Sequence, residues 1–130
     1  MIEVVCGVIR DGSGRVLACR RGAGRHLGGL WEFPGGKVEQ DELPEEALAR
    51  ELYEELGIFV TVGPRLDPVV KWTDGIVTIC LRAFWCTVCS GEPMAIEHAE
   101  IRWGEPSELE ALEWAEADVP FLQEILSAYL

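Results

Sequence analysis

The feature that most constrains this chain is a strongly patterned segment at residues 43–56. Leucines recur there at every fourth position, at Leu48, Leu52 and Leu56. This spacing is typical of one face of an α-helix. Pro44 suits the first turn of such a helix, and Gly57 is typical of the residue that follows its end. The pattern predicts a helix that packs its leucine stripe into the core.

The same helix carries a patch of acidic side chains. Glu51, Glu54 and Glu55 stand at i, i+3 and i+4 and therefore share one face beside the leucine stripe. Like charges at this spacing repel one another, and more strongly in a partly buried cleft, so a positive charge should offset them. Three carboxylates are hard oxygen ligands suited to Mg²⁺ or Mn²⁺. Taken alone, the pattern is also compatible with a solvated acidic face.

The remainder of the chain predicts a sheet around this helix. We expect strands at residues 3–10, 15–20, 30–33, 59–62, 66–71, 76–88 and 100–103, and two further helices at 106–112 and 120–129. The turn at residues 11–14 suggests a hairpin between the first two strands. With 130 residues and 48% apolar composition, one core is expected. The predicted fold is a single α+β or α/β domain over residues 1–130, with a mixed β-sheet between helices.

The charge of the chain excludes some partners. There are 23 acidic and 11 basic residues, a formal net charge of −12, which disfavours binding to nucleic-acid polymers and to anionic lipids. The first 30 residues differ from this average because they contain five arginines: Arg10, Arg15, Arg20, Arg21 and Arg25. This part of the protein could meet a small anion even though the whole molecule repels a large one.

Cysteine usage and the N-terminus indicate a reducing compartment. The five cysteines are an odd number, and the N-terminus lacks the pattern of a secretory signal, so we expect reduced thiols in the cytoplasm. No window of about 18 residues is free of charge, which excludes a membrane-spanning helix. Cys86 and Cys89 form CxxC without a second ligand pair, so buried free thiols are favoured over structural zinc.

A longer motif surrounds the acidic helix. Gly36 is followed after five residues by Glu42, and after seven more by Arg50-Glu51. This run resembles the Nudix box, Gx5Ex7REUxEExGU with U an apolar residue. It matches at Gly36, Glu42, Arg50, Glu51, Leu52, Glu54, Glu55, Gly57 and Ile58. The preceding Trp31–Gly36 is similar to the MutT-like branch. A P-loop is excluded because no GxxxxGK[ST] spacing occurs.

The resemblance implies a divalent metal site and a role for each motif residue. Its metal ligands would be Glu51, Glu54 and Glu55 together with a backbone carbonyl at Gly35 or Gly36. One of these glutamates, Glu51 or Glu54, would help to activate water. The resemblance also implies that Arg50 holds a metal-site glutamate in place and that Glu42 supports it.

The resemblance further implies an acid from a later loop. Glu97 is the candidate for a metal-binding and catalytic role, with Glu100 in reserve, and a solvated loop acid is the alternative. Its implied substrate-binding residues are Arg21, His26, Glu32, Phe33, Pro34 and Asp118. Asp118 would read the edge of the base, since an ionised carboxylate accepts hydrogen bonds. An N-cap of the helix that begins near Pro120 is the alternative for Asp118.

The activity implied is Mg²⁺-dependent hydrolysis of a nucleoside triphosphate to a monophosphate and pyrophosphate, with water attacking the β-phosphorus. The oxidised-purine enzymes of this branch carry a basic side chain near the position of Val77. Its absence leaves 8-oxo-dGTP and a pyrimidine triphosphate, as in CTP pyrophosphohydrolase relatives, as comparable expectations. The alternatives are a hydrolase of another nucleoside diphosphate derivative and a non-catalytic nucleotide sensor. We expect a monomer or weak dimer.

Overall fold

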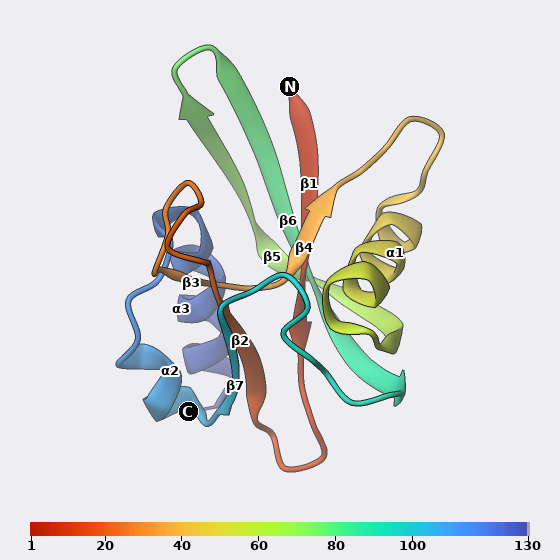
Figure 1. Cartoon of the computed structure of the whole chain (residues 1–130), viewed down its shortest axis with the longest axis vertical. Helices are drawn as coiled ribbons and strands as arrows, with labels where there is room; N and C mark the ends of the chain where they lie inside the picture. Colours follow the sequence, from red (N-terminus) through yellow and green to blue (C-terminus); the bar gives the residue numbers. More distant parts are fainter. Residues whose placement is uncertain (130) are drawn as a thin grey trace.

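A computed structural model describes residues 1–129, with the side chain of Asp74 left out. In chain order, the elements are β1 Ile2–Ile9, β2 Val16–Arg20, β3 Trp31–Glu32, β4 Gly35–Lys37, α1 Pro44–Leu56, β5 Phe59–Asp74, β6 Val77–Ser90, β7 Glu100–Gly104, α2 Pro106–Glu110, the short 3₁₀ helix η1 Glu116–Asp118, and α3 Val119–Ala128. Figure 1 shows α1 on one side of the strands and α2 and α3 on the other. Helices therefore cover two sides of a central β-structure, as the α+β expectation required.

The strands form two sheets where one was expected. The larger sheet has the order β4-β1-β6-β5 and is mixed, because β1 and β6 run parallel while its other pairs are antiparallel. The smaller sheet has the order β3-β2-β7 and is antiparallel. The predicted mixed sheet between helices is thus confirmed, and a second sheet accompanies it.

The expected hairpin of β1 and β2 is the point at which the two sheets separate. The strands meet only in an isolated bridge between Arg10 and Val16, next to a turn closed by the N–H of Asp11 donating to the carbonyl of Arg15. Beyond this bridge, β4 and β6 take the two edges of β1. The prediction of a full hairpin was therefore wrong, because β4 occupies the edge of β1 at Val4–Cys6 that a longer pairing with β2 would need.

Two further predictions about strands need correction. The segments expected at 59–62 and 66–71 belong to one strand, β5, whose register against β6 shifts on both sides of Arg65. The break expected at Pro34-Gly35-Gly36 is instead the start of β4, which pairs with β1. A Cβ atom on Gly35 would collide with the carbonyl oxygen of Val5, so only glycine allows this pairing.

The predicted helix at residues 43–56 is confirmed as α1. Leu48, Leu52 and Leu56 are fully buried in a core that includes side chains of β1, β2 and β6. Glu46 accepts the N–H of Leu43 at the start of the helix, and Gly57 ends it in the left-handed region with φ 71°. The leucine stripe predicted from the sequence is therefore the surface through which α1 packs against the strands.

A second core lies beneath α2 and α3, where Leu109, Phe121 and Ile125 are fully buried. All five cysteines are free thiols, as expected, but only four are buried: Cys89 is exposed near the C-terminal end of β6. Over the residues that the structure describes, every helix is too short or too polar to cross a membrane.

Candidate active site

Arg50 joins the acidic face of α1 to the loop that precedes it. Its Nε and Nη2 donate to the two carboxylate oxygens of Glu42 at 2.8 and 3.0 Å, and Nη2 also donates to the carbonyl of Lys37. On the helix side, Nη1 donates to Oε1 of Glu51 at 3.0 Å and lies 3.5 Å from Oε2 of Glu54. Hydrogen bonds from Arg50 lower the pKa of Glu42, so this pair is ionised. Arg50 therefore orients the carboxylates, as the motif predicted.

Gly36 on β4 lies against the carboxylate of Glu51. A Cβ atom at Gly36 would stand within 2.6 Å of both carboxylate oxygens of Glu51, far inside van der Waals contact. The glycine thus allows the backbone of β4 and the side chain of α1 to approach each other closely. This contact brings Gly36 and Glu51, both predicted metal-site residues, to one place.

Glu55 is the buried member of the acidic face. The residue is 5% exposed, and its Oε2 has no hydrogen-bond partner among the described residues. Burial, followed by the negative charges of Glu51, Glu32 and Glu97, raises the pKa of Glu55 to about 9. The carboxyl groups of α1 and the exposed Glu97 therefore act on one another electrostatically, as neighbours in one site would.

These side chains suit a hard divalent cation, although their carboxylate oxygens do not converge on a single point in the structure. Within residues 1–129 no three Asp, Glu, His or Cys side chains converge closely enough to hold a metal ion. Glu54 faces Arg50, and its side chain is 51% exposed, so it has room to change rotamer. The donors are carboxylate oxygens, one of them buried and without a partner among the described residues. A cation beside them would offset the burial and the repulsion that together raise the pKa of Glu55. The donor set therefore fits Mg²⁺ or Mn²⁺.

A second group of polar side chains adjoins Glu55. Arg21 donates through Nε to Oε1 of Glu32 at 2.7 Å, and Nε2 of His98 lies 2.9 Å from Oε2 of the same carboxylate. Burial disfavours the charge of Glu32, but hydrogen bonds from His98 and Arg21 outweigh it and lower the pKa. Nε2 of His98 is also 3.7 Å from Oε1 of Glu55. Arg21 and Glu32 were predicted site residues.

The sequence reasoning missed His98. The signals available were its position next to Glu97 and the rarity of histidine, with two in the chain. Neither signal indicates that the segment before β7 places the side chain of His98 next to Glu55 of α1. Only the packing of three separate segments makes His98 a neighbour of Glu32 and Glu55.

Asp118 and Phe33 form the third part of the candidate site. Oδ2 of Asp118 accepts the N–H of Phe33 at 2.8 Å, and the ring of Phe33 packs against Trp114 with centroids 4.6 Å apart. Burial raises the pKa of Asp118 to about 7, although the hydrogen bond from Phe33 opposes the shift. Asp118 occupies the N-cap position of α3 but makes no side-chain capping bond. The carboxyl group of Asp118 therefore bonds the backbone of Phe33 and does not cap α3.

The remaining predicted residues are more distant from the acidic face or serve the backbone. His26 lies in an exposed loop, and its carbonyl accepts a hydrogen bond from Nη1 of Arg21 at 3.0 Å. Pro34 is buried, and its carbonyl accepts the N–H of Gly7 at 2.8 Å. Glu100 forms an ion pair with Arg20 at 3.1 Å.

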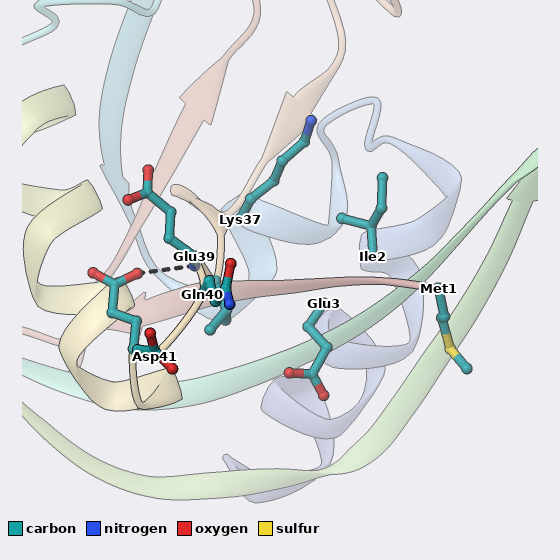
Figure 2. Close-up of a pocket in the computed structure, with 9 residues that line it drawn as sticks. Met1, Ile2, Glu3, Lys37, Glu39, Gln40 and Asp41 are labelled. Atoms are coloured by element: carbon teal, nitrogen blue, oxygen red, sulfur yellow. Dashed lines mark hydrogen bonds between the residues drawn. The ribbon is translucent and has the colours of Figure 1, made fainter.

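A cavity of about 500 Å³ lies on the outer side of the loop that Arg50 holds. Its lining includes Met1, Ile2, Glu3 and residues 37–42. Figure 2 shows Lys37, Glu39 and Asp41 around it, with the dashed hydrogen bond from the N–H of Glu39 to Glu42. Because Glu51, Glu54 and Glu55 are absent from its lining, this cavity adjoins the acidic face without containing it.

Comparison with known proteins agrees with this geometry. A family model described as the NUDIX domain matches residues 2–125. The chain is 40% identical over 127 residues to a CTP pyrophosphohydrolase of Escherichia coli (strain K12), covering 98% of this chain and 93% of that protein. It is 32% identical over 127 residues to an 8-oxo-dGTP diphosphatase of Haemophilus influenzae, with the same two coverages.

The fold agrees as well. The crystal structure of a MutT protein from Methanosarcina mazei Go1 superposes with a TM-score of 0.82 at 27% sequence identity, covering 98% of this chain and 94% of that one. The family model, the full-length relatives and the shared fold lead to the same assignment. The chain belongs to the NUDIX domain family and is a Nudix hydrolase of the MutT type, acting on nucleotide derivatives.

Proposed function

We propose that this Nudix hydrolase converts a nucleoside triphosphate to a nucleoside monophosphate and pyrophosphate with Mg²⁺, which Mn²⁺ can replace. The observation that carries the proposal is the acidic face of α1. There Arg50 orients two carboxylates, while burial and three neighbouring acids raise the pKa of Glu55. Residues 1–130 would act as one domain, as a monomer or weak dimer.

The metal would be held by carboxylates of Glu51, Glu54, Glu55 and Glu97 and by a backbone carbonyl of Gly35 or Gly36. When bound, a divalent cation neutralises charge on the phosphates and lowers the pKa of water. Arg50 engages Glu51 through Oε1, so Oε2 is the oxygen we assign to accept a proton from water. Glu54, half exposed at the rim, is the second candidate base. The attack would be directed at the β-phosphorus.

Substrate recognition would use the opposite side of the site. Arg21 and His26 would meet phosphate and sugar, and Glu32 and Pro34 would support them. Asp118, held against Phe33, would accept hydrogen bonds from amino or ring N–H donors on the base. Cytosine and oxidised guanine both offer such donors. The similarity to a CTP pyrophosphohydrolase and to an 8-oxo-dGTP diphosphatase supports these two bases and a role in nucleotide pool sanitation.

A substrate panel tests this proposal. Purified protein with Mg²⁺ would be given normal NTPs and dNTPs, 8-oxo-dGTP and nucleoside diphosphate derivatives, with both products quantified. We expect a monophosphate and pyrophosphate in equal amounts, fastest with a cytosine or oxidised guanine triphosphate. Release of inorganic phosphate from triphosphates would contradict the proposal, since that product requires cleavage of the bond between the β- and γ-phosphates. In H₂¹⁸O, attack at the β-phosphorus should place the label in pyrophosphate, and label in the monophosphate would contradict that assignment.

The same panel separates the alternatives. Turnover confined to dinucleotides or nucleotide sugars would identify a hydrolase of another nucleoside diphosphate derivative. Binding without turnover of any compound would indicate a nucleotide sensor built on the same domain and would contradict the proposed hydrolysis.

A further inference from the structure

His98 is a buried polar side chain that the proposed chemistry does not use. It lies in the segment between β6 and β7, which passes beside α1 in Figure 1. Its side chain is fully buried. The next residue, Ala99, donates its N–H to the carbonyl of Arg20, which ties this segment to the end of β2. The backbone therefore holds His98 in a defined place.

The surroundings of His98 are not those of a packing residue. Its Nε2 lies 2.9 Å from Oε2 of Glu32 and 3.7 Å from Oε1 of Glu55. Its Nδ1 is buried without a hydrogen-bond partner among the described residues. A buried imidazole with an unpaired nitrogen is unfavourable compared with an apolar side chain of similar size. The contact with two carboxyl groups must therefore provide a compensating advantage.

The chemistry of the contact assigns a proton to Nε2. Both oxygens that face it belong to carboxyl groups, and one of them, on Glu32, is ionised and already accepts a hydrogen bond from Arg21. A bare ring nitrogen would direct its lone pair at those of the oxygens. Nε2 is thus the donor, at hydrogen-bonding distance from Glu32 and with Glu55 next to it.

We propose that His98 is a positioning residue: its Nε2–H holds Glu32 and faces Glu55, and thereby fixes the buried carboxylate that would bind the metal. The proposal rests on the proposed function, because it takes Glu55 as a metal ligand. It links the Arg21–Glu32 pair, on β2 and β3, to the acidic face of α1. Hydrogen-bonding partners that orient metal ligands typically contribute about 10–100-fold to metal affinity or activity.

Two substitutions of nearly equal size separate hydrogen bonding from packing. His98→Gln keeps an N–H donor that can reach the position of Nε2, whereas His98→Met fills similar space with no donor. A role in packing alone would make the Met variant equal to the Gln variant or better. The positioning role predicts that only Gln replaces histidine.

The primary measurement is Mn²⁺ affinity of the substrate-free protein by electron paramagnetic resonance. It is accompanied by kcat, KM and Tm for each variant. We expect His98→Met to bind Mn²⁺ about 10-fold or more weakly and to lose kcat by a similar factor, with a smaller change in KM. His98→Gln should stay within about threefold of the wild type on each measure. The Tm values of the two variants should be close.

Equal Mn²⁺ affinity and kcat in the two variants, whether both high or both low, would overturn the proposal. If His98→Met does not fold, His98→Asn takes its place, since its shorter amide cannot donate from the position of Nε2. A wild-type protein that binds no Mn²⁺ would instead contradict the proposed function. Wild-type binding with indistinguishable variants refutes only the role of His98.

Discussion

The acidic face of α1 and the contact between Asp118 and Phe33 both place a carboxyl group where burial opposes its charge. On α1, Glu55 lies in a patch that also contains the guanidinium of Arg50, and the residues involved fall within 23 positions of sequence. Asp118 has a backbone N–H as its partner, and that partner is 85 residues away. Local helix geometry builds the first group, whereas the contact of η1 with the residue that follows β3 builds the second.

The comparison teaches that the two groups should respond differently to change. The face of α1 is charged and is built within one helix, so substitutions there should affect catalysis far more than stability. The Asp118–Phe33 contact joins two distant segments inside the protein, so substitutions there should alter stability and base preference together. The following predictions test this contrast, beginning with the largest effect.

Glu54→Gln should have the largest effect. It removes a proposed metal ligand and candidate base from an exposed position, so kcat should fall by about 10³-fold while Tm stays within a few degrees of the wild type. Steady-state kinetics with Mg²⁺ and the best substrate, together with thermal unfolding, would measure both. Glu45→Gln, an exposed glutamate in the first turn of the same helix, is the matched control and should keep full activity. Undiminished turnover in Glu54→Gln would remove Glu54 from the mechanism.

Arg50→Lys should have an intermediate effect. Lysine keeps the positive charge but cannot bind both oxygens of Glu42 while also reaching Glu51. We expect kcat to fall by about 10–100-fold and Mn²⁺ affinity to weaken, because Glu51 loses its orientation. Kinetics and metal titration on the same sample would show whether the two decrease together. A variant with normal metal affinity and kcat would mean that charge alone suffices.

Asp118→Asn should have the smallest effect on turnover and a distinct effect on stability. The pKa of Asp118 is about 7 in the folded protein and has an ordinary value of 3.8. Between these two pH values the unfolded chain releases a proton that the folded protein keeps. The contribution of Asp118 to the free energy of unfolding should therefore decrease as pH rises from about 4 to about 7, by up to about 1.4 kcal/mol per pH unit, and stay constant above.

Asparagine keeps an acceptor for the N–H of Phe33 and does not ionise, so the variant should lack the contribution of Asp118, and its stability should fall less steeply between pH 4 and pH 7 than that of the wild type. Denaturant unfolding of both proteins at pH 4, 5.5, 7 and 8 would measure it. The Asn variant should also shift the ratio of kcat/KM between cytosine and oxidised guanine substrates. Parallel stability profiles for the two proteins would show that Asp118 is not the group responsible.

Much of the fold and of the acidic face could be predicted because their signals are local. The period of the leucines, Pro44 and Gly57 place a helix that the structure confirms as α1. The spacing of Glu51, Glu54 and Glu55 places them on one face, because the number of residues per turn of an α-helix is fixed. The family resemblance depends on the same contiguous residues.

The errors concern relations between segments. A turn at residues 11–14 predicts a hairpin, but how far β1 and β2 pair depends on β4, which occupies one edge of β1 at Val4–Cys6, and on β6, which occupies the other. Gly35 and Gly36 read as a break in sequence, yet they form a strand because neighbouring backbone and Glu51 leave no room for a side chain. Which of several possible neighbours a segment packs against cannot be predicted from the residues of that segment alone.

By itself, the sequence determined the helix, its stripe and its acidic face, because backbone geometry converts spacing into position without reference to the remainder of the chain. Only the tertiary structure decided which groups lie against that face. It set His98 between Glu32 and Glu55, and it joined Asp118 to Phe33. The reason is physical: burial and the charges of distant neighbours set the protonation of Glu55 and Asp118, and those neighbours exist only once the chain has folded.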